Sequence, residues 1–241
     1  MIAVASVRSG GATTLALCLA ACTEDAVVVE ADPAGGVLAL RYGLGREPGL
    51  ITLASTHGPA PDLAAHCQLL PGGLATVVAP ESPERAAQVL ASAGRRLSAT
   101  LVAEGPRTVV VDVGRLWASS PAAVLAAAAE VALVVARPRA EELVAAAEVV
   151  RFLGERAGIV LAGDGPYRPS EVADELGCWV FGPLAWDPRA AAALAEGGSP
   201  AALARSGLVR SARALARTVI GDPPPAARTG SRRRRPAEAS V

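Results

Sequence analysis

Short valine-rich apolar runs alternate with longer stretches rich in alanine and leucine along most of the chain. Short apolar runs are typical of strands buried on both faces of a parallel sheet, and the longer stretches are typical of helices. Strands are predicted over residues 2–7, 26–31, 74–79, 108–113, 131–136, 158–162 and 179–181. Helices are predicted over residues 11–22, 83–102, 121–129, 139–153, 169–176, 188–194 and 200–220.

This alternation predicts an α/β protein with a doubly wound, mainly parallel sheet flanked by helices. In such sheets the ligands bind beyond the carboxyl ends of the strands. One folded domain is predicted over residues 1–220. Residues 221–241 are rich in proline and arginine and predict a disordered tail.

The tail carries a run of four basic residues: Arg232, Arg233, Arg234 and Arg235. Such a run would give weak contact with DNA or another acidic surface. A solvated run of charge that only aids solubility is the simpler interpretation.

Composition restricts the chemistry that the chain can perform. All 23 basic residues are arginine, 23 acidic residues balance them, and none of the 241 residues is lysine. A lysine nucleophile, a Schiff base and a phosphate-binding lysine are therefore excluded within this chain, although a bias of the coding sequence explains the missing lysine most simply. No apolar run is long enough to cross a bilayer.

The cysteines are too few and too scattered for a disulfide scaffold, and neither histidine completes a zinc pattern with them. They are interpreted as small core residues of a cytoplasmic protein. The alternative is export, because residues 12–22 end in Leu-Ala-Ala-Cys, the form of a bacterial lipoprotein cleavage box. The apolar segment before this stretch and the Gly10-Gly11 pair fit a strand, loop and helix better than a signal peptide.

The first predicted strand leads into Val-Arg-Ser-Gly-Gly-Ala-Thr-Thr, residues 7–14, and then into a helix. A glycine-bearing turn that opens a helix presents backbone N–H groups and the positive end of the helix dipole to an anion. The full phosphate-loop pattern requires lysine where this chain has Ala12, but Thr13 stands where a hydroxyl would reach Mg²⁺. The loop alone is weak support for phosphate binding.

Carboxylates follow two further strands. Glu30 and Asp32 end the second strand at i, i+2 spacing, which points both toward the rim where phosphates would lie. Asp112 follows three consecutive valines, as in a buried strand that delivers one carboxylate to a magnesium ion. Helix capping by Asp32 and a turn at Asp112 are the plainer alternatives for each residue alone.

These three segments together resemble the MinD/ParA class of deviant-Walker P-loop ATPases, most closely the actinobacterial MinD-like proteins with a lysine-free loop. The segment Glu-Ala-Asp-Pro-Ala-Gly-Gly, residues 30–36, is the most specific part. The likeness continues through residues 161–167 and 182–189 and covers most of residues 1–220.

The resemblance implies ATP and Mg²⁺ as cofactors. Backbone amides of Ser9, Gly10, Gly11 and Ala12 would surround the phosphates, Thr13 would ligate Mg²⁺, and Thr14 would contact the α-phosphate. Asp32 would orient the attacking water and Asp112 would hold Mg²⁺ through water. Segment 183–188, including Pro188, would lie near the adenine.

The family's two loop lysines are missing, with Val7 and Ala12 at their positions. Arg8 is the one nearby cation in the sequence and would substitute in part, although arginine and lysine differ in shape. Losing this charge costs phosphoryl transfer several powers of ten in rate. We therefore expect a nucleotide-dependent switch that hydrolyses ATP weakly or slowly.

The implied role is positioning or partitioning, as in chromosome partitioning or cell division, with a nucleotide-dependent homodimer and protein partners of a division or secretion system. A non-catalytic scaffold for pilus, secretion or division machinery is the alternative. A dinucleotide-dependent oxidoreductase, with Glu30 on the ribose, is a third hypothesis, but its glycine fingerprint is absent. The helix at 200–220 has an apolar stripe that would pack on the sheet or, alternatively, lie on a membrane.

Overall fold

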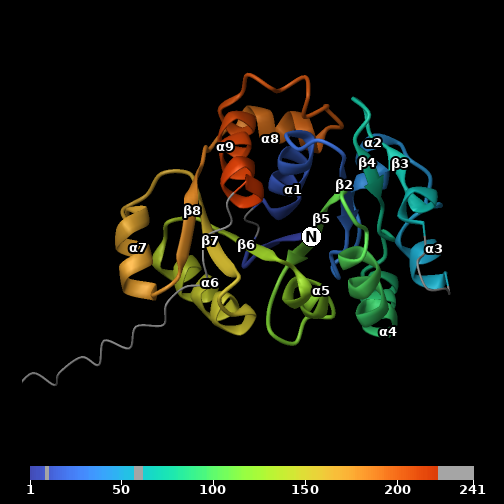
Figure 1. Ribbon diagram of the computed structural model, residues 1–241. Coiled ribbons are helices and arrows are strands. Elements are labelled where there is room, and N and C mark those ends of the chain that lie inside the picture. Colours follow the sequence, from blue (N-terminus) through green and yellow to red (C-terminus); the bar gives the residue numbers. More distant parts are fainter. Residues whose placement is uncertain (9–10, 57–61, 222–241) are drawn as a thin grey trace, which may run out of the picture.

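The protein is described here from a computed structural model, over residues 1–8, 11–56 and 62–221. Its centre is an eight-stranded sheet in the order β3-β4-β2-β5-β1-β6-β7-β8 (Figure 1). All neighbouring strands are parallel except β3 and β4. The strands are β1 Ile2–Ser6, β2 Ala26–Glu30, β3 Gln68–Leu69, β4 Ala75–Val77, β5 Thr108–Arg115, β6 Val131–Ala136, β7 Ala157–Ala162 and β8 Trp179–Leu184.

Helices cover both faces of the sheet, as the alternating pattern predicts. In Figure 1, α1, α8 and α9 lie above the sheet and α4, α5 and α6 lie below it. The helical segments are α1 Ala12–Ala21, α2 Leu38–Tyr42, α3 Leu50–Ser55, η1 Leu63–His66, α4 Pro83–Val102, α5 Ala123–Ala128, α6 Ala140–Leu153, α7 Pro169–Leu176, α8 Pro188–Ala195 and α9 Gly207–Gly221. The predicted α/β, doubly wound fold is thereby confirmed.

The sheet separates two hydrophobic cores. One core joins one face of the strands to α3, α4, α5, α6 and α7, and the other joins the opposite face to α1, α2, α8 and α9. Central strands contribute to both, so valine fills β2 and β5 on each face. Alternate residues of these apolar strands therefore anchor helices on opposite sides.

The strand order brings together the ends of strands that are distant in sequence. β5 lies between β1 and β2, and its Asp112 is level with Glu30 of β2 and Val4 of β1. Because these strands are parallel, their carboxyl ends meet at one rim of the sheet. The first three candidate segments of the sequence therefore converge on one place.

Two parts of the sequence analysis need correction. The pattern gave no elements between residues 37 and 73, where the structure has α2, α3, η1 and β3. These elements have two to six residues each, which is too short to establish a period. The helix predicted over 200–220 begins instead at Gly207, after a series of turns, because the Ser206 hydroxyl accepts the N–H of Val209 and fixes the helix start there.

Helix α9 uses its apolar stripe inside the fold. Leu208, Val209, Ala212, Leu215, Ala216 and Val219 are buried in the core that also contains α1. The prediction that this helix packs on the sheet is confirmed, and its stripe is not available to a membrane in this conformation. Within the described ranges, no helix is both long and apolar enough to span a bilayer.

Candidate functional site at the carboxyl rim of the sheet

The amino end of α1 forms one side of the candidate site. Gly11 precedes the helix with a φ of 91°, a left-handed conformation that favours glycine, and none of the described side chains caps the helix. Among the described residues, the N–H groups of the first turn therefore have no side-chain acceptor, and they can bind a ligand. Thr13 and Thr14 are half-buried on this turn, and Arg8 is exposed just before it. Ser9 and Gly10 lie outside the described residues.

The two positions at which the resembled family has lysine hold buried apolar residues in this chain. Val7 and Ala12 are 6% and 5% exposed and pack into the core. Backbone amides and the helix dipole are therefore the main source of positive potential that α1 offers to an anion.

Asp112 is fully buried in β5, level with the last residue of β2, and has an exposed fraction of 0%. Its Oδ1 accepts the N–H of Gly114 at 3.1 Å, whereas Oδ2 has no hydrogen-bond partner in the described structure. Burial raises the pKa of this carboxyl to about 7, and Glu30 and Asp32 add to the increase, while Thr13 and the Gly114 N–H lower it. A buried polar atom without a partner is costly, and this one fits a ligand or cation next to Thr13.

Asp32 lies against the carboxyl-terminal part of β5, at Gly114. Its Oδ1 accepts the N–H of Ala34 at 2.8 Å, and burial raises its pKa. Gly114 leaves the space that the carboxylate occupies, because a Cβ there would come 2.0 Å from Asp32 Cγ. Gly114, two residues after Asp112, thus allows Asp32 to lie close to the Asp112 side of β5.

Gly114→Ala tests this close approach. We expect a loss of about 2–4 kcal/mol in unfolding free energy, because the new methyl group displaces Asp32 and the φ of 60° strains any non-glycine residue. Urea unfolding measures the change. Gly105→Ala is the matched control, since Gly105 has a φ of 79° and a Cβ added there would meet no atom within 4 Å. Equal losses in the two variants would show that backbone strain alone is responsible.

The prediction that Glu30 points to the phosphate rim is wrong. Its Oε1 accepts the N–H groups of Val37 and Leu38, at 2.6 and 3.0 Å, and its Oε2 accepts the N–H of Ala79 at 2.9 Å. The side chain is 1% exposed and fixes the turn after β2 to the end of β4. Glu30 is therefore a structural residue, which also removes the ribose-binding acid of the oxidoreductase hypothesis.

Thr13 and Asp112 fit the ligand set of a magnesium ion. Mg²⁺ prefers a few protein oxygens, with the remaining positions filled by water and substrate phosphate. A hydroxyl and the unpartnered carboxylate oxygen would supply two such positions, directly or through water. In the described part of the chain, no group of three or more His, Cys, Asp or Glu side chains forms an all-protein metal site.

A pocket of about 350 Å³ adjoins the amino end of α1. Gly11 and Thr14 line it on one side, and the segment after β8, including Trp186 and Pro188, lines it on the other. The structure thus brings Pro188 beside Gly11 and Thr14. Ala162, Leu184, Ala191 and Leu208 give the pocket largely apolar walls.

The sequence analysis missed Arg137, and it included Trp186 only as part of the segment 183–188. The guanidinium of Arg137, just after β6, lies over the indole of Trp186, with its Cζ 5.3 Å from the ring centroid. Since β7 separates β6 from β8, only the strand order reveals that these residues meet. In the sequence, the only indication of this contact was that a basic residue and a tryptophan each follow a predicted strand.

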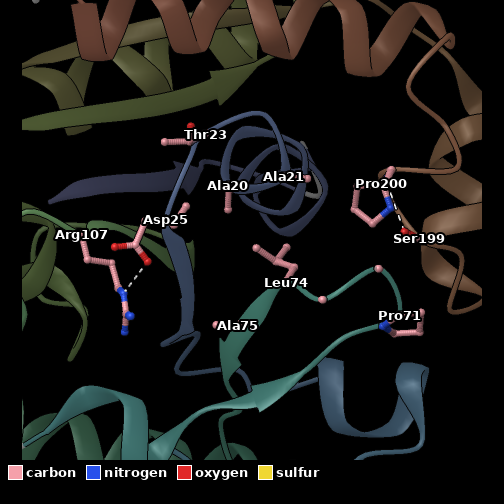
Figure 2. A pocket seen from close by; sticks show the side chains of 14 residues that line it. Ala20, Ala21, Thr23, Asp25, Pro71, Leu74, Ala75, Arg107, Ser199 and Pro200 are labelled. Carbon is pink, nitrogen blue, oxygen red and sulfur yellow. Dashed lines mark hydrogen bonds and ion pairs between the residues drawn. The ribbon is translucent and has the colours of Figure 1, made fainter.

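A second cavity, of about 300 Å³, lies elsewhere and contains none of the predicted site residues (Figure 2). It surrounds the carboxyl end of α1, with Ser199 and Pro200 on one side and the Arg107–Asp25 ion pair, at 3.0 Å, on the other. Asp25 and Ala26 lie at the start of β2, so this cavity is at the amino rim of the sheet.

Known structures share this architecture, although no protein-family model matches the sequence and no curated protein matches it significantly. The cell division ATPase MinD of Pyrococcus furiosus has 18% identity and a TM-score of 0.71, over 89% of this chain and 95% of that one. A ParA family ATPase from Chlorobium tepidum has 14% identity and a TM-score of 0.69, over 89% and 96%. MinD of Pyrococcus horikoshii with Mg-ADP has 15% identity and a TM-score of 0.68, over 89% and 92%. At such identities the likeness is one of fold, and the chain has the fold of the MinD and ParA ATPases.

Proposed function

We propose that this chain is a MinD/ParA-like ATP-binding protein that acts as a nucleotide-dependent positioning or partitioning switch and hydrolyses ATP weakly. One observation carries the proposal: Asp112 keeps an unpartnered buried oxygen next to Thr13, at the open amino end of α1. A fold under no functional constraint gains nothing from this arrangement, because burying the carboxylate opposes folding. The similar MinD structure from P. horikoshii contains Mg-ADP, which supports the same ligand class here.

Each site residue has a role in this proposal. The amides of residues 9–12 would surround the phosphates, with Arg8 adding charge at the exposed edge. Thr13 and Asp112 would hold Mg²⁺, Thr14 would contact the α-phosphate, and Asp32 would orient the water that attacks the γ-phosphate. Segment 183–188 would receive the base, since Pro188 and Thr14 line one pocket.

Weak hydrolysis follows from the missing charge. Positive groups stabilise the transition state of phosphoryl transfer, and the buried Val7 and Ala12 supply none. A switch with slow turnover would stay in its ATP-bound state for long periods. A nucleotide-dependent homodimer and a protein partner of a division, partitioning or secretion system complete the proposal.

The second candidate is a scaffold on the same fold that binds no nucleotide. The buried apolar residues at the two lysine positions favour it, because amides and a dipole alone bind a triphosphate less strongly than amides with lysine. It would serve pilus, secretion or division machinery through protein contacts.

Calorimetric titration with ATP and ADP, with and without Mg²⁺, distinguishes the two candidates. The switch predicts micromolar affinity that depends on Mg²⁺ and falls about 10-fold or more in the Thr13→Ala variant, because a magnesium ligand is lost. Thr218→Ala, an exposed threonine on α9, is the matched control. No heat and no thermal shift at millimolar nucleotide would establish the scaffold instead.

A further inference from the structure

Trp186 has an unusual place at the candidate site. It follows β8 and lines the pocket beside α1, yet its side chain is 60% exposed. The segment passes closely over the end of β7, because a Cβ at Gly163 would lie 3.1 Å from Trp186 Cβ. A large aromatic ring fixed at a pocket and left half in water offers apolar surface to a ligand.

Arg137 holds the indole from the side of β6. Its guanidinium lies 5.3 Å from the ring centroid, within the range of a cation–π contact. Glu142 anchors this arginine in turn: its Oε2 accepts the Arg137 backbone N–H at 2.9 Å, and its Oε1 lies 3.6 Å from Nε. Because Glu142 is 4% exposed, the anchor is built into the fold.

The rest of the pocket suits a flat ring more than a charged group. Its other walls include alanine and leucine side chains. The carboxylate that lines it, Asp187, is already engaged, with Oδ1 accepting the N–H of Ala190 and Oδ2 the N–H of Gly207. Stacking is therefore the main interaction that side chains of this pocket offer, whereas α1 offers its amides to phosphate.

We infer that Trp186 stacks on the base of a purine nucleotide, and that Arg137 is a positioning residue that holds the indole for this contact. The inference rests on the proposed nucleotide site and adds the residues that select the base. A purine covers more of the indole than a pyrimidine does, so ATP and GTP bind more tightly than CTP and UTP.

Trp186→Ala separates base binding from phosphate binding. ATP affinity falls about 10-fold, a typical loss when a stacking aromatic is removed. Inorganic tripolyphosphate, which has the phosphates and no base, binds with an affinity changed less than about 2-fold. Trp117→Ala removes an indole of similar exposure outside the pocket and leaves both affinities unchanged. Equal losses for ATP and tripolyphosphate would overturn the inference.

Arg137 is tested by its coupling to Trp186. Arg137→Met weakens ATP binding about 3-fold, Arg137→Lys restores part of the loss, and Arg137→Met adds nothing in the Trp186→Ala background. Additive losses would show that Arg137 acts independently of the indole. If the wild type binds neither ATP nor tripolyphosphate, the proposed function itself fails. If it binds ATP and Trp186→Ala binds equally well, only this inference fails.

Discussion

Glu30→Ala is expected to unfold a large fraction of the protein, with a loss of about 3–5 kcal/mol in unfolding free energy. The variant leaves the N–H groups of Val37, Leu38 and Ala79 without their acceptor, and two of these three bonds are fully buried. An unsatisfied buried donor costs about 1–3 kcal/mol, and bonds to a charged acceptor are at the upper end. The turn after β2 and the end of β4 separate, although neither contains the substitution.

Urea unfolding monitored by circular dichroism measures this loss. Glu24→Ala is the matched control, because Glu24 is an exposed glutamate just before the same strand. We expect its effect to be below about 0.5 kcal/mol. A loss below about 1 kcal/mol in Glu30→Ala would show that the loop amides find other partners, and that Glu30 is not the structural residue described above.

Asp112→Asn is expected to stabilise the nucleotide-free protein by about 2 kcal/mol above pH 7. Burial raises the pKa of Asp112 from 3.8 in the unfolded chain to about 7 in the folded one, so the folded state binds the proton more tightly. The wild type therefore loses stability as pH rises from about 4 to about 7, and the loss is complete above pH 7. A shift of about three pKa units corresponds to a gain of at most about 4 kcal/mol in unfolding free energy. The observed gain is smaller because the asparagine side chain that replaces Asp112 is itself a polar group buried in the core.

The difference between the two thermal melting curves, measured from pH 4 to pH 8, isolates this effect from other groups. We expect the difference in stability between the variant and the wild type to grow from about pH 4 to about pH 7 and to stay constant at higher pH. Asp174→Asn, the same change at an exposed position on α7, is the control. A variant that is less stable than the wild type at pH 8 would contradict the expectation. The substitution also removes a proposed magnesium ligand, so it is expected to lose Mg²⁺-dependent nucleotide affinity while gaining stability.

The long elements of the fold were predictable because a buried parallel strand leaves a continuous apolar run. The runs at β5 and β6 were identified with starts that match the structure. The region between β2 and β4 was not predictable, because its elements are short and held by specific contacts. One such contact is the Gln68 side chain, which bonds to the backbone of Gly45 and Pro48.

The candidate site was predictable only as far as strand ends determine it. Asp32 follows β2, and Asp112 lies in β5 level with the last residue of β2, so their convergence follows once the parallel sheet is assumed. The hydrogen bonds of Glu30 could not be predicted, because they depend on the positions of the loops after β2 and β4. The Arg137–Trp186 contact depends on the order of β6, β7 and β8, which local sequence does not encode.

The position of β5 between β1 and β2 also determines when the centre of the sheet can form during synthesis. Both outer strands belong to the first 30 residues, whereas the strand that joins them spans Thr108–Arg115. In a chain that emerges from the ribosome, β1 and β2 therefore lack the strand that joins them until Thr108–Arg115 has been synthesised. Formation of the candidate site then coincides with closure of the sheet centre, a late and long-range step.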